Sequence, residues 1–239
     1  MADEEYLRHS RVAIQEAYAR RDAGGKRSLY AWHLPENLLM QYRLNSEMAA
    51  ALKRAGWSDL TDKHCLDIGC GIGGWLRTLL AWGSVASNLH GIDLLPDRIE
   101  RARKLSPNLD FQVSDAWPIP FADQSMDLVT ANVVFSSILD AEARSSLADE
   151  MKRVVKTGSL ILIYDFRISD PRNPDTIGIN QDEIRRLFPK MLCHRQSLIL
   201  APPICRRVAR LSPLLAYGME RCFPFMRTHA VYVLKNELT

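Results

Sequence analysis

The chain has 239 residues, and its 47% hydrophobic content is enough to fill the core of one α/β domain with additions. With 31 Lys and Arg against 28 Asp and Glu, the net charge of +3 gives no case for a nucleic-acid partner, which needs a concentrated basic face with interleaved aromatic residues. The five cysteines lack CxxC spacing and the six histidines lack HExxH spacing, so we expect no metal site, no disulfide framework and a reducing, cytoplasmic compartment.

The N-terminal part of the chain has the pattern of two helices that precede the core. Residues 4–21 show helical periodicity, and the polar, glycine-containing stretch 20–28 breaks it. A second helix is expected over residues 35–56. The N-terminus is acidic and no apolar run approaches the roughly 18 residues of a membrane span, so we expect neither a span nor a signal peptide. We therefore predict an N-terminal helical segment and cap over 1–58, followed by a core domain over 59–239.

A glycine-rich turn with an acid just upstream is the most informative feature of the core. Gly69, Gly71 and Gly73 fit GxGxG, the turn that lets the backbone pass close to a ligand between a strand and a helix. A dinucleotide would place its pyrophosphate over this turn, where the carboxylate of Asp67 would repel it. Asp67 instead suits a ligand that brings cationic groups to the turn, such as the ammonium and sulfonium of S-adenosylmethionine.

Two further acids follow the next two strand-like segments. Asp93 ends a short strand about 20 residues beyond the turn, the offset of the acid that binds ribose in βαβ nucleotide sites. Asp115 follows residues 109–113, and its carboxylate can accept from an adenine amino group while apolar neighbours contact the ring. The run 127–135, which includes Asn132, is placed to close the pocket beside the ligand. Each acid alone could be a helix cap or turn residue, so the prediction depends on their order and spacing.

The alternation of strands and helices continues beyond these acids. A charged helix is expected to end at Gly158, before the buried strand 159–164, and residues 191–200 and 229–235 are expected to be the last two strands. The polar loop 165–175 follows a strand at the carboxyl end of the sheet, where open α/β folds bind ligands. It is therefore a candidate for acceptor binding, and an ordinary surface connection is the alternative.

A basic, amphipathic insertion over residues 201–228 separates those two strands. Its apolar residues recur at helical spacing while the arginines fall on another face, and Pro213 is expected to kink or end the first helix. Three interpretations stay open: a lid over the acceptor, a contact with an anionic membrane surface or a lipid-linked substrate, or a helix packed on the core with its arginines in water.

Over roughly residues 60–168 the motifs LDIGCGIG, GIDLLP and PFADQSMD resemble those of class I S-adenosylmethionine-dependent methyltransferases, in the small-molecule branch with the type 11 methyltransferase domain. Met126 stands where that family usually has an aromatic residue, a change that should affect packing only. The resemblance implies a Rossmann-like α/β fold: a seven-stranded, mostly parallel sheet with an antiparallel last strand and helices on both faces. It implies S-adenosylmethionine as cofactor. The matching cofactor-binding positions are Asp67, Gly69, Gly71, Gly73, Asp93, Leu94, Asp115, Ala116 and Trp117.

Such an enzyme would work by in-line attack of an acceptor on the sulfonium methyl, with the two substrates held close together in a dry pocket. Arg43 could pair with the methionine carboxylate, although a surface arginine is the commoner explanation. An oxygen acceptor would need a base, for which the candidates are His33, Asp165, His194 and His229. The residues do not choose among them. We prefer His33 because the segment with Tyr30 and Trp32 often folds across the cofactor in this family.

The acceptor is expected from resemblance alone. The pattern from residues 200–203 through 227–229 is similar to methyltransferases associated with bacterial surface polysaccharides, which implies O-methylation of a sugar or glycan. Two alternatives stay open: methylation of a small lipophilic acceptor, which the apolar insertion would suit, and a catalytically silent adenosylmethionine-binding partner subunit. The sequence makes no prediction of oligomeric state.

Overall fold

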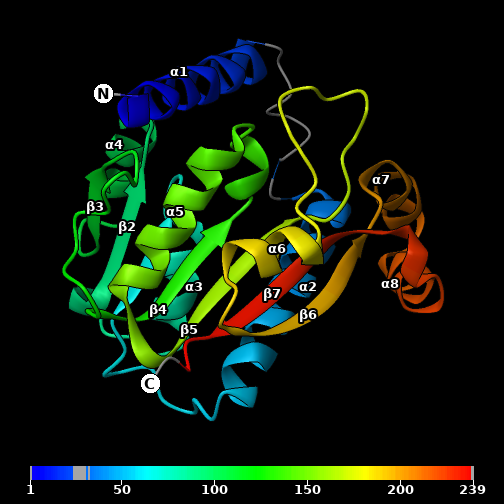
Figure 1. Ribbon diagram of the computed structural model, residues 1–239. Helices are drawn as coiled ribbons and strands as arrows, with labels where there is room; N and C mark the ends of the chain where they lie inside the picture. The colour runs from blue at the N-terminus through cyan, green and yellow to red at the C-terminus, as the bar shows by residue number, and fades with distance from the viewer. Residues whose placement is uncertain (1, 24–30, 32, 238–239) are drawn as a thin grey trace.

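The computed structural model describes residues 2–23, 31 and 33–237, and its centre is one seven-stranded sheet with strand order β3-β2-β1-β4-β5-β7-β6 (Figure 1). The strands are β1 (Cys65–Ile68), β2 (Leu89–Asp93), β3 (Asp110–Val113), β4 (Met126–Asn132), β5 (Val155–Phe166), β6 (Leu192–Leu200) and β7 (Arg227–Lys235). Neighbours from β3 to β5 pair in parallel, and β7 pairs antiparallel with both β5 and β6. The predicted fold class, including its antiparallel last strand, is confirmed.

Helices cover both faces of the sheet. The helices are α1 (Ala2–Ala23), α2 (Pro35–Arg54), α3 (Gly74–Ala81), α4 (Pro96–Leu105), α5 (Ala141–Val154), α6 (Gln181–Leu187), α7 (Pro202–Leu211) and α8 (Pro213–Cys222), with short 3-10 turns η2 (Ala86–Asn88), η3 (Phe135–Ser137) and η4 (Pro224–Met226). One core cluster joins α2, α3 and α4 to the sheet, and a second joins α5 and α6 to the other face. Because both faces are covered, β5 can carry the uninterrupted apolar and buried run 160–163.

Local sequence signals explain where several helices begin. Proline occupies the first turn of α2, α4, α7 and α8, where its missing N–H costs no helical hydrogen bond. The side chain of Asp140 caps α5 by accepting from the Ala143 N–H, and Asn180 caps α6 by accepting from the Glu183 N–H. These caps fix where α5 and α6 begin.

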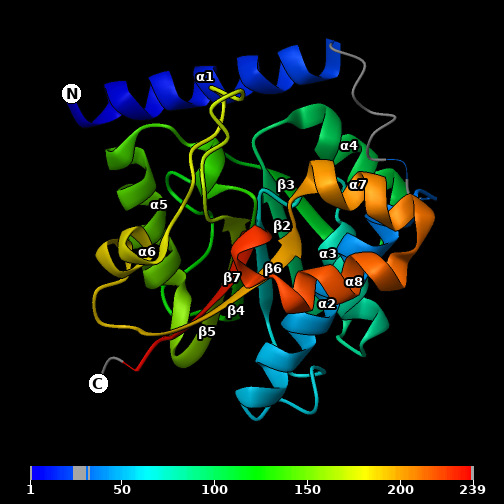
Figure 2. The same ribbon diagram turned by 90° about the vertical axis from the view of Figure 1, so that its right-hand side faces the viewer.

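The helix α1 lies across the carboxyl end of the parallel strands, above the loop that follows β5 (Figures 1 and 2). Tyr6 Oη lies 2.7 Å from Ser146 Oγ on α5, and Arg20 pairs with Asp175 at 2.7 Å. Polar contacts therefore tie this helix to two separate parts of the core. The helices expected over 4–21 and 35–56 are confirmed as α1 and α2.

One boundary differs from expectation, and one matches it. The helix expected to reach Gly158 ends at Val154, because Val155 already pairs with Met126 of β4 and Gly158, at φ +80°, bonds to the Asn236 carbonyl as part of β5. The insertion over 201–228 forms two helices, and Pro213 ends the first by starting the second.

Candidate functional site

A cavity of about 940 Å³ opens at the carboxyl end of the parallel strands, beneath α1. Its lining comes from the carboxyl ends of β1 to β5, from His229 of β7, from α1, α2, α4, α5 and α7, and from the loop after β5. Seven of the predicted cofactor residues line it: Gly69, Asp93, Leu94, Asp115, Ala116, Trp117 and Asn132. Within the described ranges, no group of three or more His, Cys, Asp or Glu side chains could hold a metal ion. The chemistry available here is therefore that of carboxylates, amides, arginines and aromatic rings.

The glycine turn needs glycine for conformation and for space. Gly69, Gly71 and Gly73 have φ values of +64°, +55° and +79°, a region that other residues enter only with strain. A Cβ on Gly69 would lie 2.6 Å from a methyl of Val134, and one on Gly73 would lie 2.5 Å from the ring of Phe111. Of these three glycines only Gly69 lines the cavity, so the other two shape the turn behind it.

Asp93 joins this turn to the end of β2. Its Oδ2 accepts the Gly71 N–H at 2.8 Å and its Oδ1 accepts the Leu95 N–H at 2.9 Å. Burial raises the pKa of Asp93, while these hydrogen bonds and the nearby Arg98 guanidinium act in the opposite direction. Each carboxylate oxygen can accept at least one more hydrogen bond, and the residue lines the cavity. The geometry suits a ligand with two adjacent hydroxyl donors.

Asp67 lies one layer below the cavity surface. It is 2% exposed, and its Oδ1 accepts from Thr130 Oγ1 at 2.7 Å and from Asn132 Nδ2 at 3.2 Å. Burial raises the pKa of Asp67 to about 7. Asn132 Oδ1 is buried with no hydrogen-bond partner in the described part of the chain, although the residue lines the cavity. An unsatisfied acceptor beside a buried carboxylate favours a ligand that donates hydrogen bonds and carries positive charge.

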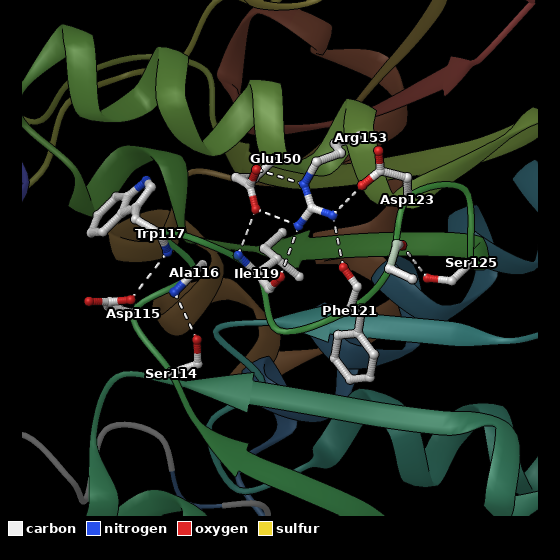
Figure 3. Close-up of polar contacts among 11 residues, drawn as sticks. Ser114, Asp115, Ala116, Trp117, Ile119, Phe121, Asp123, Ser125, Glu150 and Arg153 are labelled. Atoms are coloured by element: carbon white, nitrogen blue, oxygen red, sulfur yellow. Dashed lines mark hydrogen bonds and ion pairs between the residues drawn. The ribbon is translucent and has the colours of Figure 1, made fainter. Parts of the chain in front are cut away.

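The loop after β3, which carries Asp115 and Trp117, is held rigidly from α5 (Figure 3). Arg153 donates to the Ile119 and Phe121 carbonyls at 2.9 and 2.8 Å, and it pairs twice with Glu150, at 2.8 and 2.7 Å. Glu150 in turn accepts the Ile119 N–H at 2.7 Å. One arginine–glutamate pair on a helix thus fixes both ends of a short backbone segment and orients the residues before it.

Asp115 also contacts α1. Its carboxylate accepts the Trp117 N–H at 3.2 Å and forms an ion pair with Arg11. Tyr18, further along α1, lines the cavity, and the guanidinium groups of Arg21 and Arg98 lie over its ring at 4.8 and 4.2 Å. The helix α1 is therefore a wall of the cavity as well as a cover.

Arg43 lies away from the cavity, contrary to its predicted contact with a bound carboxylate. It is 4% exposed, pairs with Glu220 at 2.9 Å and with Glu47 at 3.2 Å, and lies over the Tyr217 ring. Because two carboxylates already satisfy the guanidinium, we assign Arg43 to the contact between α2 and α8. Sequence reasoning erred here because nothing in the sequence marks Glu220 as its distant partner.

Of the candidate bases, only His229 lines the cavity. His33 and His194 are exposed and outside the lining, while Tyr30 and Trp32 lie outside the described residues. Asp165 is fully buried outside the lining as well, where its carboxylate accepts the Ser136 and Phe166 N–H groups at 3.0 and 2.8 Å. Burial raises the pKa of Asp165 to about 6. The structure thus places the two preferred bases, His33 and Asp165, away from the cavity, and Asp165 in a structural position.

His229 packs between Tyr164 and Phe166, with ring centroids 5.2 and 4.3 Å away. It is 5% exposed, its Nδ1 lies 3.0 Å from Thr228 Oγ1, and burial lowers its pKa to about 4. The imidazole is therefore neutral near pH 7, when it can accept a hydrogen bond but binds a proton only weakly.

Several lining residues were not predicted. They lie outside the predicted motifs and include Tyr18, Met40, Arg98, Ile138, Tyr164 and Arg206. Arg98 carries a usable signal, because it stands one turn into the helix that follows the ribose-type acid. Tyr18 and Met40 carry none, since they reach the cavity only through tertiary packing. The loop after β5 contributes Asp170, Arg172 and Asn173 to the lining, as its predicted place at the sheet edge implies.

Comparison with known proteins identifies the central segment. Residues 65–158 match the family model described as a methyltransferase domain. A 2-methyl-6-phytyl-1,4-hydroquinone methyltransferase of Synechocystis sp. is 34% identical over 110 residues, covering 45% of this chain and 33% of that protein. A protein of Oryza sativa subsp. japonica named "Probable tocopherol O-methyltransferase, chloroplastic" is 31% identical over 159 residues, covering 64% of this chain and 42% of that protein.

The fold has solved counterparts. The structure of phosphoethanolamine N-methyltransferase 2 from Haemonchus contortus in complex with S-adenosyl-L-methionine superposes with a TM-score of 0.60 at 18% identity, covering 81% of this chain and 53% of that one. The matched segment spans less than half the length of the two curated relatives named above. Residues 65–158 are thus similar to a methyltransferase domain, within a fold that the chain shares with a solved methyltransferase.

Proposed function

We propose that the protein transfers a methyl group from S-adenosylmethionine to a small lipophilic acceptor. The observation that carries the first half is Asp93, a cavity-lining carboxylate whose Oδ2 accepts the Gly71 N–H and whose Oδ1 accepts the Leu95 N–H, which leaves a lone pair on each oxygen for a ribose diol. The methyltransferase-domain match over the same turn supports it.

The residues present fit this cofactor. The orphaned Asn132 Oδ1 can accept from its ammonium group, and the buried Asp67 carboxylate, hydrogen-bonded to the same amide, favours positive charge there. Asp115 and Trp117, on the loop fixed by α5, are placed for the adenine. When bound, the cofactor supplies an electrophilic methyl group on a cationic sulfonium.

The contribution of the chain is positioning and exclusion of water. The carboxylates and the glycine turn orient the methyl donor. The helix α1 and the loop after β5 cover the cavity, so that the acceptor is held close to the donor. His229 is the one candidate base in the lining, and in its neutral form it can accept a hydrogen bond from an acceptor hydroxyl. We propose this orienting role for His229 and withdraw the base roles of His33 and Asp165.

The second half of the proposal, a lipophilic acceptor, is supported by the lining and by the relatives. Apolar side chains form much of the wall, among them Met40, Leu44, Val133, Val134 and Ile138. The two relatives named above are described as methyltransferases of a phytyl hydroquinone and of tocopherol, both apolar molecules with a ring hydroxyl. Five expectations from the sequence stay predictions: the type 11 assignment, the polysaccharide-associated assignment, O-methylation of a sugar, the silent partner subunit and the cytoplasmic compartment.

An acceptor screen tests both halves. The purified chain is incubated with S-adenosylmethionine and a prenylated hydroquinone, a prenylated phenol, a hexose-containing glycan or no acceptor, and formation of S-adenosylhomocysteine is followed. We expect product with the prenylated compounds, lost in Asp93→Asn and retained in Asp97→Asn, a matched carboxylate that is exposed on the first turn of α4. If product forms with the glycan alone, the proposal of a lipophilic acceptor is wrong and the acceptor is a sugar. If the cofactor binds but no product forms, the chain is better described as a catalytically silent partner subunit.

A further inference from the structure

The most exposed large hydrophobic side chains gather on one part of the molecule, the α7–α8 hairpin, which we define as residues 202–226. Leu211, Leu214 and Phe225 are 85%, 82% and 76% exposed, more than any other large hydrophobic residue of the described chain. Leu215 and Phe223 add 54% and 42%, and the rings of the two phenylalanines meet edge to face at 5.9 Å. A cluster of this kind marks an interaction surface.

The inner side of the hairpin is packed against the rest of the protein by other residues, so the exposed side chains are not part of the hydrophobic core. Cys205, Ala209 and Ala216 are buried against α2 and the end of β6. The Glu220 carboxylate is buried in its ion pair with Arg43, and Arg210 reaches Glu36 at 3.1 Å. Figure 2 shows the two helices side by side along one flank of the molecule, with α2 beside them. The apolar residues therefore belong to a rigid outer face.

The charges on this face are of one sign. Arg207, Arg210 and Arg221 are exposed, whereas the single acid of the hairpin, Glu220, is 2% exposed and neutralised within the protein. On α8 the exposed positions Leu214 and Arg221 are two turns apart on the same side of the helix. Apolar side chains bordered by arginines match a surface that is apolar inside and anionic at its boundary.

We propose that the outer face of the α7–α8 hairpin binds the surface of an anionic lipid membrane, with the exposed leucines and phenylalanines at the boundary of the acyl chains and with Arg207 and Arg221 at the headgroups. None of the described helices is long and apolar enough to cross a membrane. The contact is thus peripheral. Pro202 and Arg206 of α7 line the cavity, so one helix contributes both to the cavity wall and to the proposed membrane-binding face.

A second copy of the chain fits this face less well. A two-fold interface presents the same patch from both subunits, so Arg207 and Arg221 would face an equally cationic patch with no exposed acid on the hairpin to pair with. An anionic bilayer supplies the opposite charge over the whole face. The charge pattern therefore selects the membrane.

Co-sedimentation of the full chain with vesicles tests the proposal, with no cofactor or acceptor present, so its outcome is independent of the methyl-transfer activity. Vesicles of phosphatidylcholine with one third phosphatidylglycerol are compared with vesicles of phosphatidylcholine alone. The double substitution Leu214→Ser with Phe225→Ser probes the apolar face. Leu105→Ser with Leu192→Ser, at positions 56% and 60% exposed outside the hairpin, is the matched control.

We expect binding to the anionic vesicles that weakens at least about tenfold in the hairpin variant and stays unchanged in the control. Reversing Arg207 and Arg221 to Glu should abolish the preference for phosphatidylglycerol, and the same change at Arg101, an exposed arginine of α4, should not. Equal loss in the hairpin and control variants, absence of binding by the folded wild type, or a dimer that dissociates when Leu214 and Phe225 are replaced would overturn the proposal.

Discussion

Arg153→Met provides a direct test of how α5 shapes the cavity. The substitution keeps an apolar stem and removes the guanidinium that donates to the Ile119 and Phe121 carbonyls. Each hydrogen bond from a charged donor is worth roughly 1.5–3 kcal/mol when buried, and the arginine side chain is 29% exposed, so we take about 1 kcal/mol for each. The pair with Asp123, whose side chain is 76% exposed, adds little.

The expected loss is therefore about 2 kcal/mol, which lowers the Tm of a chain of this size by roughly 4–8 °C. The affinity for S-adenosylmethionine should fall as well, because the loop with Asp115 and Trp117 would have to be ordered on binding. Arg186→Met is the matched control: it removes an equivalent Glu-x-x-Arg pair, with Glu183, from an arginine that is 52% exposed. It should change stability by about 0.5 kcal/mol or less.

Thermal unfolding by circular dichroism and cofactor titration by calorimetry measure both effects. Equal Tm shifts in Arg153→Met and Arg186→Met would refute the reasoning, since the carbonyl contacts are what distinguishes the two arginines. An Arg153→Met protein with a lowered Tm and wild-type cofactor affinity would refute the link between the loop and the site.

The remaining predictions concern the glycine turn and two histidines, His229 and His33. Gly73→Ala should destabilise the fold by about 1–3 kcal/mol more than Gly71→Ala, measured by urea unfolding. Both glycines have positive φ, but only a Cβ at position 73 would meet the Phe111 ring, at 2.5 Å. Equal losses of stability in the two variants would show that backbone strain alone matters. Since the pKa of His229 is about 4 when folded and 6.5 ordinarily, the unfolded chain binds an extra proton between these values. The stability of the wild type relative to His229→Phe should thus be constant above about pH 7 and fall by up to about 3 kcal/mol as the pH drops to 4; a parallel pH profile for the two proteins would contradict the neutral, buried imidazole. His33→Ala should leave turnover within about twofold of the wild type, because the residue lies outside the cavity lining, and a large loss of turnover would restore its base role.

The sequence predicted the parts of the site that follow one another along the chain. The glycine turn, Asp93 and Asp115 each stand at the end of a parallel strand, and such strand ends meet at one edge of the sheet, so order alone brings them together. The fold class and its antiparallel last strand were predicted from the family resemblance of the motifs. Pro213 alone also predicted the division of the insertion into two helices.

What the sequence missed depends on contacts between distant residues. Arg43 pairs with Glu220, which lies 177 positions away along the chain. Asp165 accepts the Ser136 N–H. Neither side chain therefore reaches the cavity. Arg11 and Tyr18 reach the site because α1 crosses the sheet edge, and no periodicity within that helix indicates the crossing. The end of the helix before β5 was missed because Val155 and Gly158 complete ladder and loop hydrogen bonds with β4 and Asn236.

The most direct test of the central claim is calorimetric titration of the wild type, Asp93→Asn and Asp97→Asn with S-adenosylmethionine, S-adenosylhomocysteine and NADH. We predict micromolar binding of the two adenosyl ligands to the wild type and to Asp97→Asn, at least about tenfold weaker binding to Asp93→Asn, and no binding of NADH. A folded wild type that binds NADH, or that binds neither adenosyl ligand, would contradict the assignment of this cavity to S-adenosylmethionine.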